Sequence, residues 1–542
     1  MLNFKKKLMM KNRKYFTLIP ACALFVFSAC TDLEIEETDS IIVNQTGEFT
    51  GVGDVDATLS GIYDAVRGQL ENQANLYALN EVSTDEFLVP TRGTDWGDNG
   101  VWRTLHQHSW SPIHQHVRDT WNEQNSIIFR TTEIIDERSN ATPQQEAEAR
   151  FLRAFATFWV MDLYGQVPFR GPDEGIEVDP TVMSRAEAFD FIMEDLNTAA
   201  ANIATASPGT EATNRATKAA VHFMLAKMYL NKHIYTGTGS PDAGDMQQVI
   251  SNVDAISAMG FGLEEGYFGI FSPKLDNETI WYTNSGVGNV MWHTLHYNQN
   301  TPANGGGGWN GFTTLAEFYD LFEGDPNSNF MGDGQEERRG YVPTEGSPVG
   351  VDFDGDGVAD EIDEDGDGML DGSQIGFGML IGQQYGIDGS KLQAEAGKDL
   401  SFTKELPGLL GNGQSTGVRV IKYHPTNGSF TGHKIVFRYA DAHLMKAEAA
   451  LNGGGGDATE LVNELRTIRK ASPLSSVTSE DIIDERGREL YSEFWRRNDL
   501  IRFGKFTEAW GYKDASEDYR TLYPIPASAI ISNPNLTQNE GY

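Results

Sequence analysis

Long blocks of helical periodicity, separated by stretches rich in Gly, Asn and Asp, constrain the fold of this 542-residue chain more than any other feature. Apolar residues recur every three to four positions in nine blocks, near 54–70, 116–136, 143–164, 184–205, 215–232, 437–452, 457–471, 478–496 and 498–510. Hydrophobic residues make up 39% of the chain, enough for a substantial core. The sequence therefore predicts a mainly α-helical protein with long loop-rich insertions at about 71–115 and 260–436.

Three of these blocks begin with the residues that start helices. Pro143 lies at a first turn, and Ser184 and Asp457 are each followed three residues later by a glutamate. A Ser or Asp side chain before the first turn accepts hydrogen bonds from the free backbone N–H groups there. These starts fix the beginnings of the predicted helices.

Two of the predicted helices carry the same stripe of side chains, Ala219, Phe223, Ala226, Leu230 and Ala440, Leu444, Ala447, Leu451. A small residue every seven positions lets a partner helix approach closely. The pattern is similar to the second helix of a tetratricopeptide repeat. The copies lie 221 residues apart, which is not a multiple of 34. Any repeats are therefore heavily interrupted, and ordinary helix packing is the alternative source of the stripe.

The first thirty residues have the pattern of a targeting segment. Six basic residues lie between Lys5 and Lys14, and an almost wholly apolar run from Tyr15 to Phe27 ends in Ser28-Ala29-Cys30. This resembles the lipobox of bacterial lipoproteins, with Phe27 where Leu is usual. We expect residues 1–29 to be a signal peptide, starting at Met1 or at Met9-Met10, and Cys30 to carry lipid. The alternative is a plain secretory signal cut after an A-x-A-like site.

The charge balance excludes several partners. Against 42 basic residues there are 78 acidic ones, a net charge of −36, which becomes −42 when the six basic residues of the signal leave. Such a surface repels phosphate, so we expect no binding of nucleic acid or anionic headgroups. Both cysteines, Cys22 and Cys30, lie in the targeting segment, which leaves no disulfide framework. No later segment reaches the roughly eighteen apolar residues of a membrane helix.

Four blocks of the chain resemble the SusD/RagB family of surface nutrient-binding lipoproteins. They comprise Arg150–Phe155 with Asp162–Phe169, Ala216–Asn231, Arg438–Ala449, and Asp484–Leu490 with Asp499–Lys505 and Pro524–Asn539. Their order and spacing match from Cys30 to the last residue, so 30–542 is expected to form a single SusD-like domain. The acidic stretch Thr31–Glu37 is typical of lipoproteins exported to the cell surface in Bacteroidetes-type bacteria.

The resemblance implies a fold, a partner and a location. The expected fold is four tetratricopeptide-like helix pairs, formed by about 54–70, 116–260 and 437–510, with ligand-binding insertions on one face. The expected function is non-catalytic binding of an oligo- or polysaccharide and its delivery to a SusC-like TonB-dependent barrel. The protein would be anchored by lipid in the outer membrane and face outward. Two alternatives stay open: a surface glycoside hydrolase, and a peptide-binding or assembly scaffold of the same transporter complex.

The two insertions contain the residue types that bind sugars. Sugar rings stack their C–H faces on aromatic planes, and their hydroxyls pair with amides, carboxylates and arginine. Six of the ten tryptophans lie in 92–110 and 281–312, whereas Trp121 and Trp159 lie on helices and are expected in the core. The candidate ligand-binding residues are Arg92, Asp95, Trp96, Asn99, Trp102, Trp292, Tyr297, Trp309 and Asn310.

Trp96 and Trp309 are the foremost of these candidates. Trp96 lies among short polar residues, and Trp309 follows four glycines that would let the backbone approach a ligand. The family resemblance adds that Trp96 and Asn99 have the spacing of a Trp and an Asn in the starch-binding founder. Later aromatics of that binding arc would correspond to Tyr297 and Trp309. The alternative for any of these tryptophans is that it seals a loop onto the scaffold.

An acidic loop at 352–374 has the spacing of a calcium site. Aspartates at positions 1, 3, 5 and 9, a Gly at position 6 and an acidic twelfth residue wrap oxygens around a hard cation. A second copy begins at Asp363 and ends at Gln374, an arrangement that resembles thrombospondin type 3 repeats. The candidate ligands are Asp352, Asp354, Asp356, the carbonyl of Val358, Asp360, Asp363, Asp365, Asp367, the carbonyl of Met369, and Asp371. We expect structural Ca²⁺; the alternative is a solvated acidic loop.

Other chemistry is weakly indicated. His106, His108, His114 and His116 could ligate zinc, but hydrogen bonding within a loop is the simpler interpretation. Abundant Asp and Glu leave a glycosidase carboxylate pair possible. The charged run that includes Asp481, Glu485 and Glu489 is interpreted as a salt-bridged surface or a scaffold contact.

Overall fold

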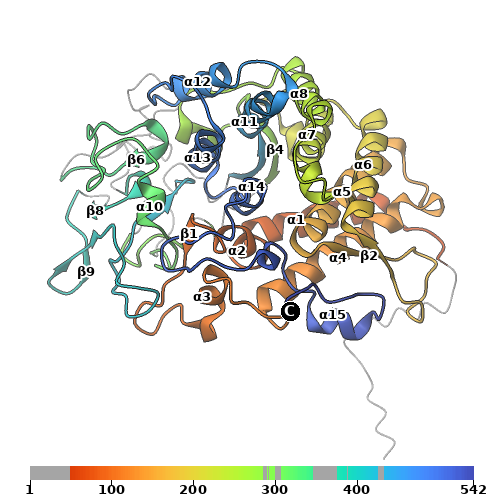
Figure 1. Ribbon diagram of the computed structural model, residues 1–542, viewed down its shortest axis with the longest axis horizontal. Coiled ribbons are helices and arrows are strands. Elements are labelled where there is room, and N and C mark those ends of the chain that lie inside the picture. The colour runs from red at the N-terminus through yellow and green to blue at the C-terminus, as the bar shows by residue number, and fades with distance from the viewer. Residues whose placement is uncertain are drawn as a thin grey trace, which may run out of the picture. The chain divides into compact units, whose positions relative to one another are not determined.

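The computed structural model describes residues 49–284, 290, 292–299, 307–345, 375–386, 389–424 and 432–542. Helices dominate this part of the chain (Figure 1). They are α1 (Val55–Glu71), α2 (Asn75–Glu81), α3 (Val101–His106), α4 (Gln115–Ile135), α5 (Pro143–Tyr164), α6 (Arg185–Asn202), α7 (Lys218–Tyr235), α8 (Ala243–Ala258), α10 (Ala316–Tyr319), α11 (Tyr439–Ala449), α12 (Ala458–Ile468), α13 (Ser479–Leu490), α14 (Arg496–Arg502) and α15 (Ala527–Ser532). The prediction of a mainly helical fold is confirmed.

The predicted helix starts are the observed ones. Thr142 and Gln145 cap each other's backbone N–H groups at the start of α5, with Pro143 at its first position. Ser184 and Glu187 form the same reciprocal arrangement at α6. The Asp457 side chain accepts from two N–H groups of α12. These caps satisfy backbone donors that have no partner inside the helix.

All nine predicted blocks contain a helix, although the last two end earlier than expected, at Leu490 in α13 and Arg502 in α14. Helix α8 was not among the predicted blocks. Its apolar residues Met246, Val249, Val253 and Ile256 lie on one buried face, a spacing that the sequence does contain. Polar and small residues between them weaken the periodicity along the chain.

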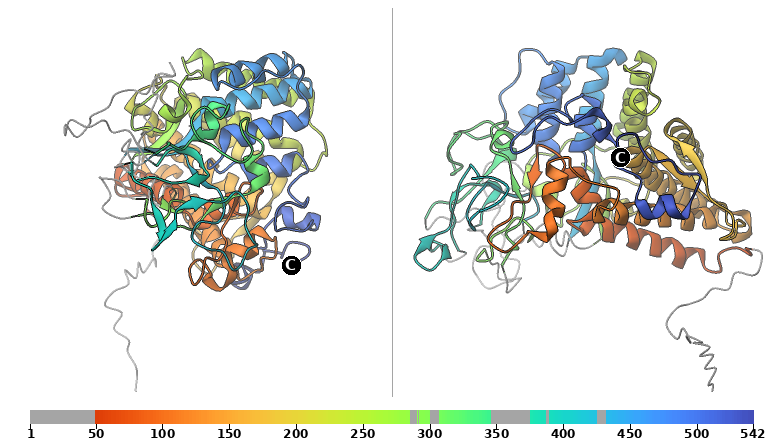
Figure 2. Two further views of the ribbon diagram at one scale, coloured as in Figure 1. Left: turned by 90° about the vertical axis from the view of Figure 1, so that its left-hand side faces the viewer. Right: turned by 60° about the horizontal axis from the view of Figure 1, so that its bottom comes forward.

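Consecutive helices pack against each other to form the scaffold. Helix α5 packs on both α4 and α6, α7 packs on α8, and α8 and α12 both pack on α11. The late helix α11 therefore lies beside α7 and α8, from which it is far apart in sequence, and the blue helices lie next to the green ones in Figure 2. The matching stripes of α7 and α11 are buried up to Leu230 and Ala447. Phe223 of α7 stacks on Phe437, 4.2 Å between ring centroids, just before α11.

The strands are short and pair in small antiparallel sheets. The longest pair joins β4 (Thr279–Asn284) to β13 (His433–Arg438), which closes the second insertion at its base. The other strands are β1 (Phe87–Leu88), β2 (Gln166–Phe169), β3 (Thr181–Ser184), β5 (Thr313–Thr314), β6 (Gly340–Tyr341), β7 (Phe377–Leu380), β8 (Gly382–Gln383), β9 (Gln393–Glu395), β10 (Lys398–Asp399), β11 (Ser401–Phe402) and β12 (Arg419–Ile421). Strands β6 to β12 lie together, away from the helix pairs α4 to α8 (Figure 1).

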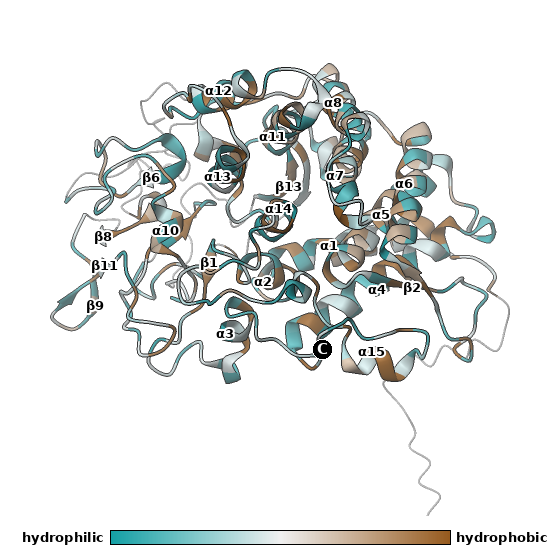
Figure 3. Ribbon diagram, in the orientation of Figure 1, coloured by the Kyte–Doolittle hydropathy of each residue, from teal (hydrophilic) through white to brown (hydrophobic). Residues whose placement is uncertain are grey.

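One large hydrophobic core runs through the scaffold, and a smaller one lies within the second insertion. Most helices carry both apolar and polar residues, as expected for helices with one buried face (Figure 3). Within the described residues, no helix is both long and apolar enough to cross a bilayer.

The charged run on α13 is buried, not a surface. Glu489 accepts from Arg438 (2.6 Å) and Arg469 (3.1 Å), and Glu485 accepts from Arg338 (2.7 Å). Burial alone would raise the pKa of Glu489, but the three guanidinium groups around it lower that pKa well below its usual range. Of the two predicted roles, the scaffold contact is the one observed. We call this set, with Glu278 and Glu493, the ion network.

Candidate ligand-binding site

Three segments that carry the predicted ligand-binding residues lie against one another. The backbone N–H groups of Gly308, Trp309 and Asn310 donate to the carbonyls of His296, Trp292 and Leu295, which pairs 308–310 with 292–296. The loop before α3 then lies across both segments. The first and second insertions thus form one surface, although about 200 residues separate them along the chain.

Trp96 and Trp309 meet at the centre of this surface. The indole Nε1–H of Trp96 donates to the carbonyl of Trp309 (2.9 Å). The Trp96 ring stands edge-on against the buried Phe312, 5.8 Å between centroids. Trp309 is 36% exposed, one of the few large hydrophobic side chains that face solvent. Both foremost candidates therefore belong to one surface.

Tyr297 joins this surface through Asp95. Its hydroxyl donates to an Oδ of Asp95, so the loop at 92–99 is held at both the indole and the carboxylate. Burial and the Asp95 carboxylate raise the pKa of Tyr297 to about 12, so the hydroxyl stays protonated. We call Trp96, Tyr297 and Trp309 the aromatic platform.

The platform is built on strained backbone. Trp96, Asn99 and Asn310 have φ values of 58°, 53° and 53°, in the left-handed region that residues other than Gly rarely adopt. Such conformations persist where surrounding contacts hold them, and they concentrate at functional sites. Asn99 is exposed beside Trp96, three residues away as the family resemblance requires.

The glycines around Trp309 serve the protein's own packing. A Cβ on Gly307 or Gly308 would lie 1.5 or 2.1 Å from the carbonyl oxygens of Tyr297 and Leu295. A Cβ on Gly311 would lie 2.4 Å from the Trp96 indole. The expectation that the glycines before Trp309 open the backbone to a ligand is therefore corrected for Gly307 and Gly308, which approach the protein backbone instead. Gly305 and Gly306 lie outside the described residues.

The remaining candidates support the platform from below. Trp102 is buried, and its indole N–H donates to Asp98 (2.7 Å). Trp292 is half-buried against both hydrophobic cores. Arg92 and Asn310 are also buried. These four side chains hold the loops in place, as the alternative interpretation of the loop aromatics anticipated for some of them.

Sequence reasoning missed the segment 412–419, which lies under the platform. Arg92 donates to the carbonyls of Gly413 (3.0 Å) and Thr416 (2.8 Å). Arg419 of β12 donates to the side-chain oxygen of Asn310 (2.8 Å). No sequence pattern marks these contacts, because they join residues more than 100 positions apart within irregular loops.

The four histidines of the first insertion are hydrogen-bonded structural residues. His106 contacts the carbonyl of Gly511 (2.8 Å), His114 that of Val101 (3.0 Å), and His116 the side chain of Asn75 (3.1 Å). His108 bridges Ser83 and Ser516. Among the described residues, no three His, Cys, Asp or Glu side chains are placed to hold a metal ion. The predicted calcium loop at 352–374 and Cys30 lie outside the described residues.

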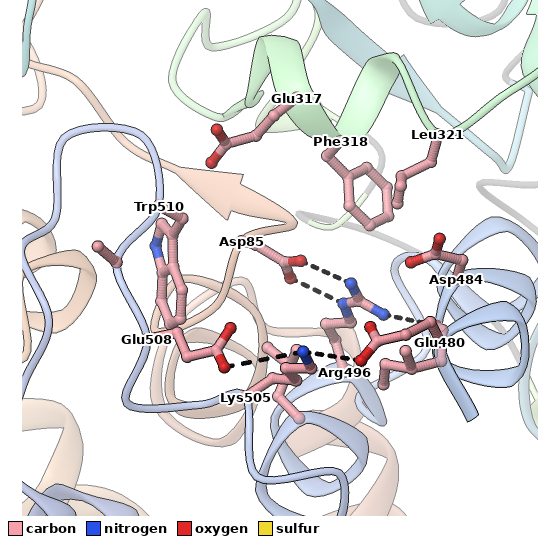
Figure 4. Close-up of a pocket in the computed structure, with 13 residues that line it drawn as sticks. Asp85, Glu317, Phe318, Leu321, Glu480, Asp484, Arg496, Lys505, Glu508 and Trp510 are labelled. Atoms are coloured by element: carbon pink, nitrogen blue, oxygen red, sulfur yellow. Dashed lines mark hydrogen bonds and ion pairs between the residues drawn. The ribbon is translucent and has the colours of Figure 1, made fainter. Parts of the chain in front are cut away.

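A separate pocket of about 280 Å³ lies between α10, α13 and the segment after α14 (Figure 4). Phe318 and Trp510 form two of its walls. Arg496 pairs with Asp85 (2.7 Å) and Lys505 with Glu480 (2.9 Å). Partial burial raises the pKa of Asp484 on its rim. None of the predicted ligand-binding residues lines this pocket.

The described residues thus define a helical scaffold protein with an aromatic surface built on its insertions. The SusD family model matches residues 277–542. The starch-binding protein SusD of Bacteroides thetaiotaomicron is 28% identical over 526 residues, which cover 88% of this chain and 87% of that protein. The chain is therefore similar to the SusD family, through the family model in its C-terminal part and through this relative over most of its length.

Solved structures agree with this assignment at the level of the fold. A SusD-like protein from Bacteroides fragilis superposes with a TM-score of 0.65 at 18% identity, covering 91% of this chain and 98% of that one. Surface glycan-binding protein A from Bacteroides thetaiotaomicron, solved with laminarihexaose, gives 0.61 at 17% identity, covering 90% and 98%. The starch-binding protein SusD and surface glycan-binding protein A carry the names of binding proteins, which agrees with the expectation of a non-catalytic protein.

Proposed function

We propose that this protein binds a glycan on the aromatic platform, outside the cell. The observation that carries the proposal is the meeting of Trp96, Tyr297 and Trp309 from two distant insertions into one partly exposed aromatic surface. Flat aromatic faces stack on the C–H faces of sugar rings. Exposed amides beside them, such as those of Asn99 and Asn298, supply partners for hydroxyl groups.

Two relatives support glycan as the ligand class. One is named for starch, and the other was solved with laminarihexaose. Both ligands are chains of glucose units. The geometry of the loops around the platform sets which sugar this chain binds, so a panel of glycans is needed.

Calorimetry of the chain from residue 31 onward against a panel of oligosaccharides tests the proposal. We expect one glycan class to bind, and Trp96→Ala to weaken that binding at least about tenfold, because loss of a stacking ring costs on the order of 1–3 kcal/mol. Trp510→Ala is the matched control, since Trp510 is half-buried in the separate pocket. Far-UV circular dichroism checks the fold of both variants.

Two results would reject the platform as the site. Binding that survives Trp96→Ala and Trp309→Ala but is lost in Trp510→Ala would place the ligand in the separate pocket. Absence of binding across the panel would remove the glycan proposal and favour a peptide ligand or an assembly role.

The proposal includes lipid anchoring and a transporter partner. Cys30 after Phe27-Ser28-Ala29 is the basis for lipidation, and the match of residues 277–542 to the SusD family model is the basis for a SusC-like TonB-dependent barrel in the outer membrane. Affinity purification of the tagged full-length protein from outer membranes is expected to retain the barrel. Cys30→Ser is expected to release the protein from the membrane fraction.

Structural calcium at 352–374 is also part of the proposal, and it rests on the sequence alone. Eight aspartates with Gly357 and Gly368 at the turn positions provide the oxygen ligands that Ca²⁺ prefers. Calcium that binds only the folded state would raise the thermal midpoint. At a free Ca²⁺ concentration 100 times the dissociation constant, the free energy of unfolding would increase by about 2.7 kcal/mol. Equal midpoints in CaCl2 and in EDTA would argue against the site, and Asp354→Asn with Asp356→Asn is the matching variant.

A further inference from the structure

Two guanidinium groups lie side by side beneath the aromatic platform. Arg92 and Arg419 both donate to the carbonyl oxygen of Thr416, at 2.8 and 2.7 Å. Arg92 is 4% exposed and Arg419 fully buried. We call these two side chains the arginine pair.

No carboxylate neutralises the arginine pair within the described residues. All its hydrogen-bond partners are backbone carbonyls, the Thr416 hydroxyl and the Asn310 amide oxygen, and the Phe402 ring faces the Arg419 guanidinium at 4.6 Å. The charged or titratable groups that act on the two guanidiniums are each other and Tyr297. Two like charges without a counter-ion in a buried place are costly, and proteins rarely retain them without a use.

Several donors of this cluster have no partner among the described residues. They are Nε and Nη2 of Arg92, Nε of Arg419 and Nδ2 of Asn310. Buried polar groups are almost always hydrogen-bonded, so unpaired ones indicate a missing water, ion or ligand group. All of the unpaired atoms are donors, so the missing partner is an acceptor.

The side chains that face the arginine pair do not supply the missing negatively charged acceptor. The Tyr297 hydroxyl stays protonated and donates to Asp95. His296 contacts Gln414 (3.0 Å), and burial, with a contribution from both arginines, lowers its pKa to about 4. The histidine is therefore neutral near pH 7. Asp95 is held on the platform by Tyr297 and forms no ion pair with the arginines.

We propose that the platform selects glycans that carry acidic groups, carboxylate or sulfate, and that the arginine pair supplies the positive charge for this selection. The inference rests on the proposed glycan-binding function. The net charge of −36 repels an anionic ligand at long range. Preference for an acidic glycan must then come from a local source, and the arginine pair lies directly under the surface where the sugar would stack.

Binding of acidic oligosaccharides and their neutralised forms tests the proposal. The probes are oligogalacturonate with its methyl ester, oligoalginate with its carboxyl-reduced form, and sulfated carrageenan oligosaccharides with their desulfated form. Neutral laminari- and malto-oligosaccharides complete the set. We expect at least one acidic form to bind about tenfold or more tightly than its neutralised partner, because the arginine pair has no carboxylate counter-ion among the described residues and its positive charge attracts an anionic group on the surface above it. Comparison of the carboxylated probes with the sulfated probes shows which of the two acidic groups the protein prefers.

Three variants assign the preference to the arginine pair. Arg92→Met is expected to reduce the acidic preference to about twofold or less, and Arg92→Lys, which keeps the charge, to retain most of it. Arg170→Met is the matched control, since Arg170 also donates to a backbone carbonyl, that of Val178, far from the platform. If Arg92→Met loses its fold by circular dichroism, Arg92→Gln, which removes the charge and keeps hydrogen-bond donors, takes its place with the same expected loss of preference.

The possible outcomes separate this inference from the proposed function. Equal binding of acidic and neutralised forms, or binding of neutral glycans alone, would overturn the inference and leave glycan binding intact. An acidic preference unchanged in Arg92→Met would also overturn it. Absence of binding to every probe would reject both this inference and the proposed glycan-binding function.

Discussion

The ion network and the arginine pair are two of the groups of buried arginines in the described residues, and they differ in what neutralises them. In the ion network, Arg338, Arg438 and Arg469 meet Glu278, Glu485 and Glu489 at 2.6 to 3.2 Å. In the arginine pair, Arg92 and Arg419 donate only to neutral oxygens, and Arg419 also faces the ring of Phe402. The ion network pairs its arginines with carboxylates, whereas the arginine pair has none among the described residues.

The difference follows from what each region joins. The ion network ties α13 to the base of the second insertion, at the junction of β4, β13 and α12. Water does not reach the buried carboxylates and guanidiniums of the ion network, so each of them must have a partner at hydrogen-bond distance. The arginine pair holds irregular loops by their carbonyls, and it lies next to a half-exposed surface where a ligand could complete it.

Breaking the ion network is expected to have the largest effect on stability. Glu489→Gln leaves Arg438 and Arg469 short of a counter-ion, and unpaired buried charge costs about 3–5 kcal/mol. Urea unfolding monitored by circular dichroism measures this. Lys446→Met is the control, because its pair with the half-exposed Asp254 (2.6 Å) is worth about 1 kcal/mol or less. Equal losses in the two variants would contradict the distinction between network and surface pair.

The scaffold could be predicted from sequence because its signals are local. Helical spacing and caps such as Thr142 with Gln145 act within a few residues, and α5 begins and ends where they predict. The burial of α13 could not be predicted in the same way. Whether Glu485 faces water or Arg338 depends on a partner 147 residues away, and the charge pattern of the helix is the same in both cases.

The site could be predicted only in part, for a related reason. Trp96, Tyr297 and Trp309 were identifiable because aromatic residues among polar loop residues are a local signal. Arg419 had no such signal, since its importance depends on Arg92 reaching the same carbonyl from the other insertion. Arg92 was predicted as a residue facing the ligand, and the structure places it beneath the platform.

Two buried glutamates, Glu81 and Glu86, are the acidic counterpart of the arginine pair. Glu81 accepts from the backbone N–H of Phe494, and Glu86 from that of Ser492, both at 2.5 Å. Burial raises the pKa of Glu81 to about 7, with Lys434 and Lys422 opposing that rise, and burial and Glu81 raise that of Glu86. The folded state therefore keeps a proton that the unfolded chain releases above about pH 4.5.

This acid pair predicts a fall in stability as pH rises from about 4.5 to about 7. In that window the folded state binds more protons than the unfolded state, so the free energy of unfolding decreases with pH. Glu81→Gln, which keeps the acceptor for Phe494, is expected to remove about 2 kcal/mol of that decrease. Urea unfolding at pH 5 and pH 8 measures it. An unchanged pH dependence in Glu81→Gln, with exposed Glu480→Gln as control, would show that the pair is not the source.

The smallest expected change in stability comes from the platform itself, because loops tolerate adjustment that the scaffold does not. A Cβ on Gly311 would lie 2.4 Å from the Trp96 indole, so Gly311→Ala must push that ring aside. Overpacking of a half-exposed ring is expected to cost about 1 kcal/mol in stability. Glycan affinity is expected to fall about tenfold, because the stacking face moves.

Gly68→Ala on α1 provides the comparison, since a Cβ there meets nothing within 4 Å. It is expected to stabilise the protein by about 0.5–1 kcal/mol without changing binding. Tryptophan fluorescence and calorimetry of the two variants separate the effects. A Gly311→Ala variant that unfolds as readily as Glu489→Gln would mean that the platform is part of the scaffold. One that binds glycan normally would mean that the position of Trp96 does not determine affinity, and would move the centre of the site to Trp309.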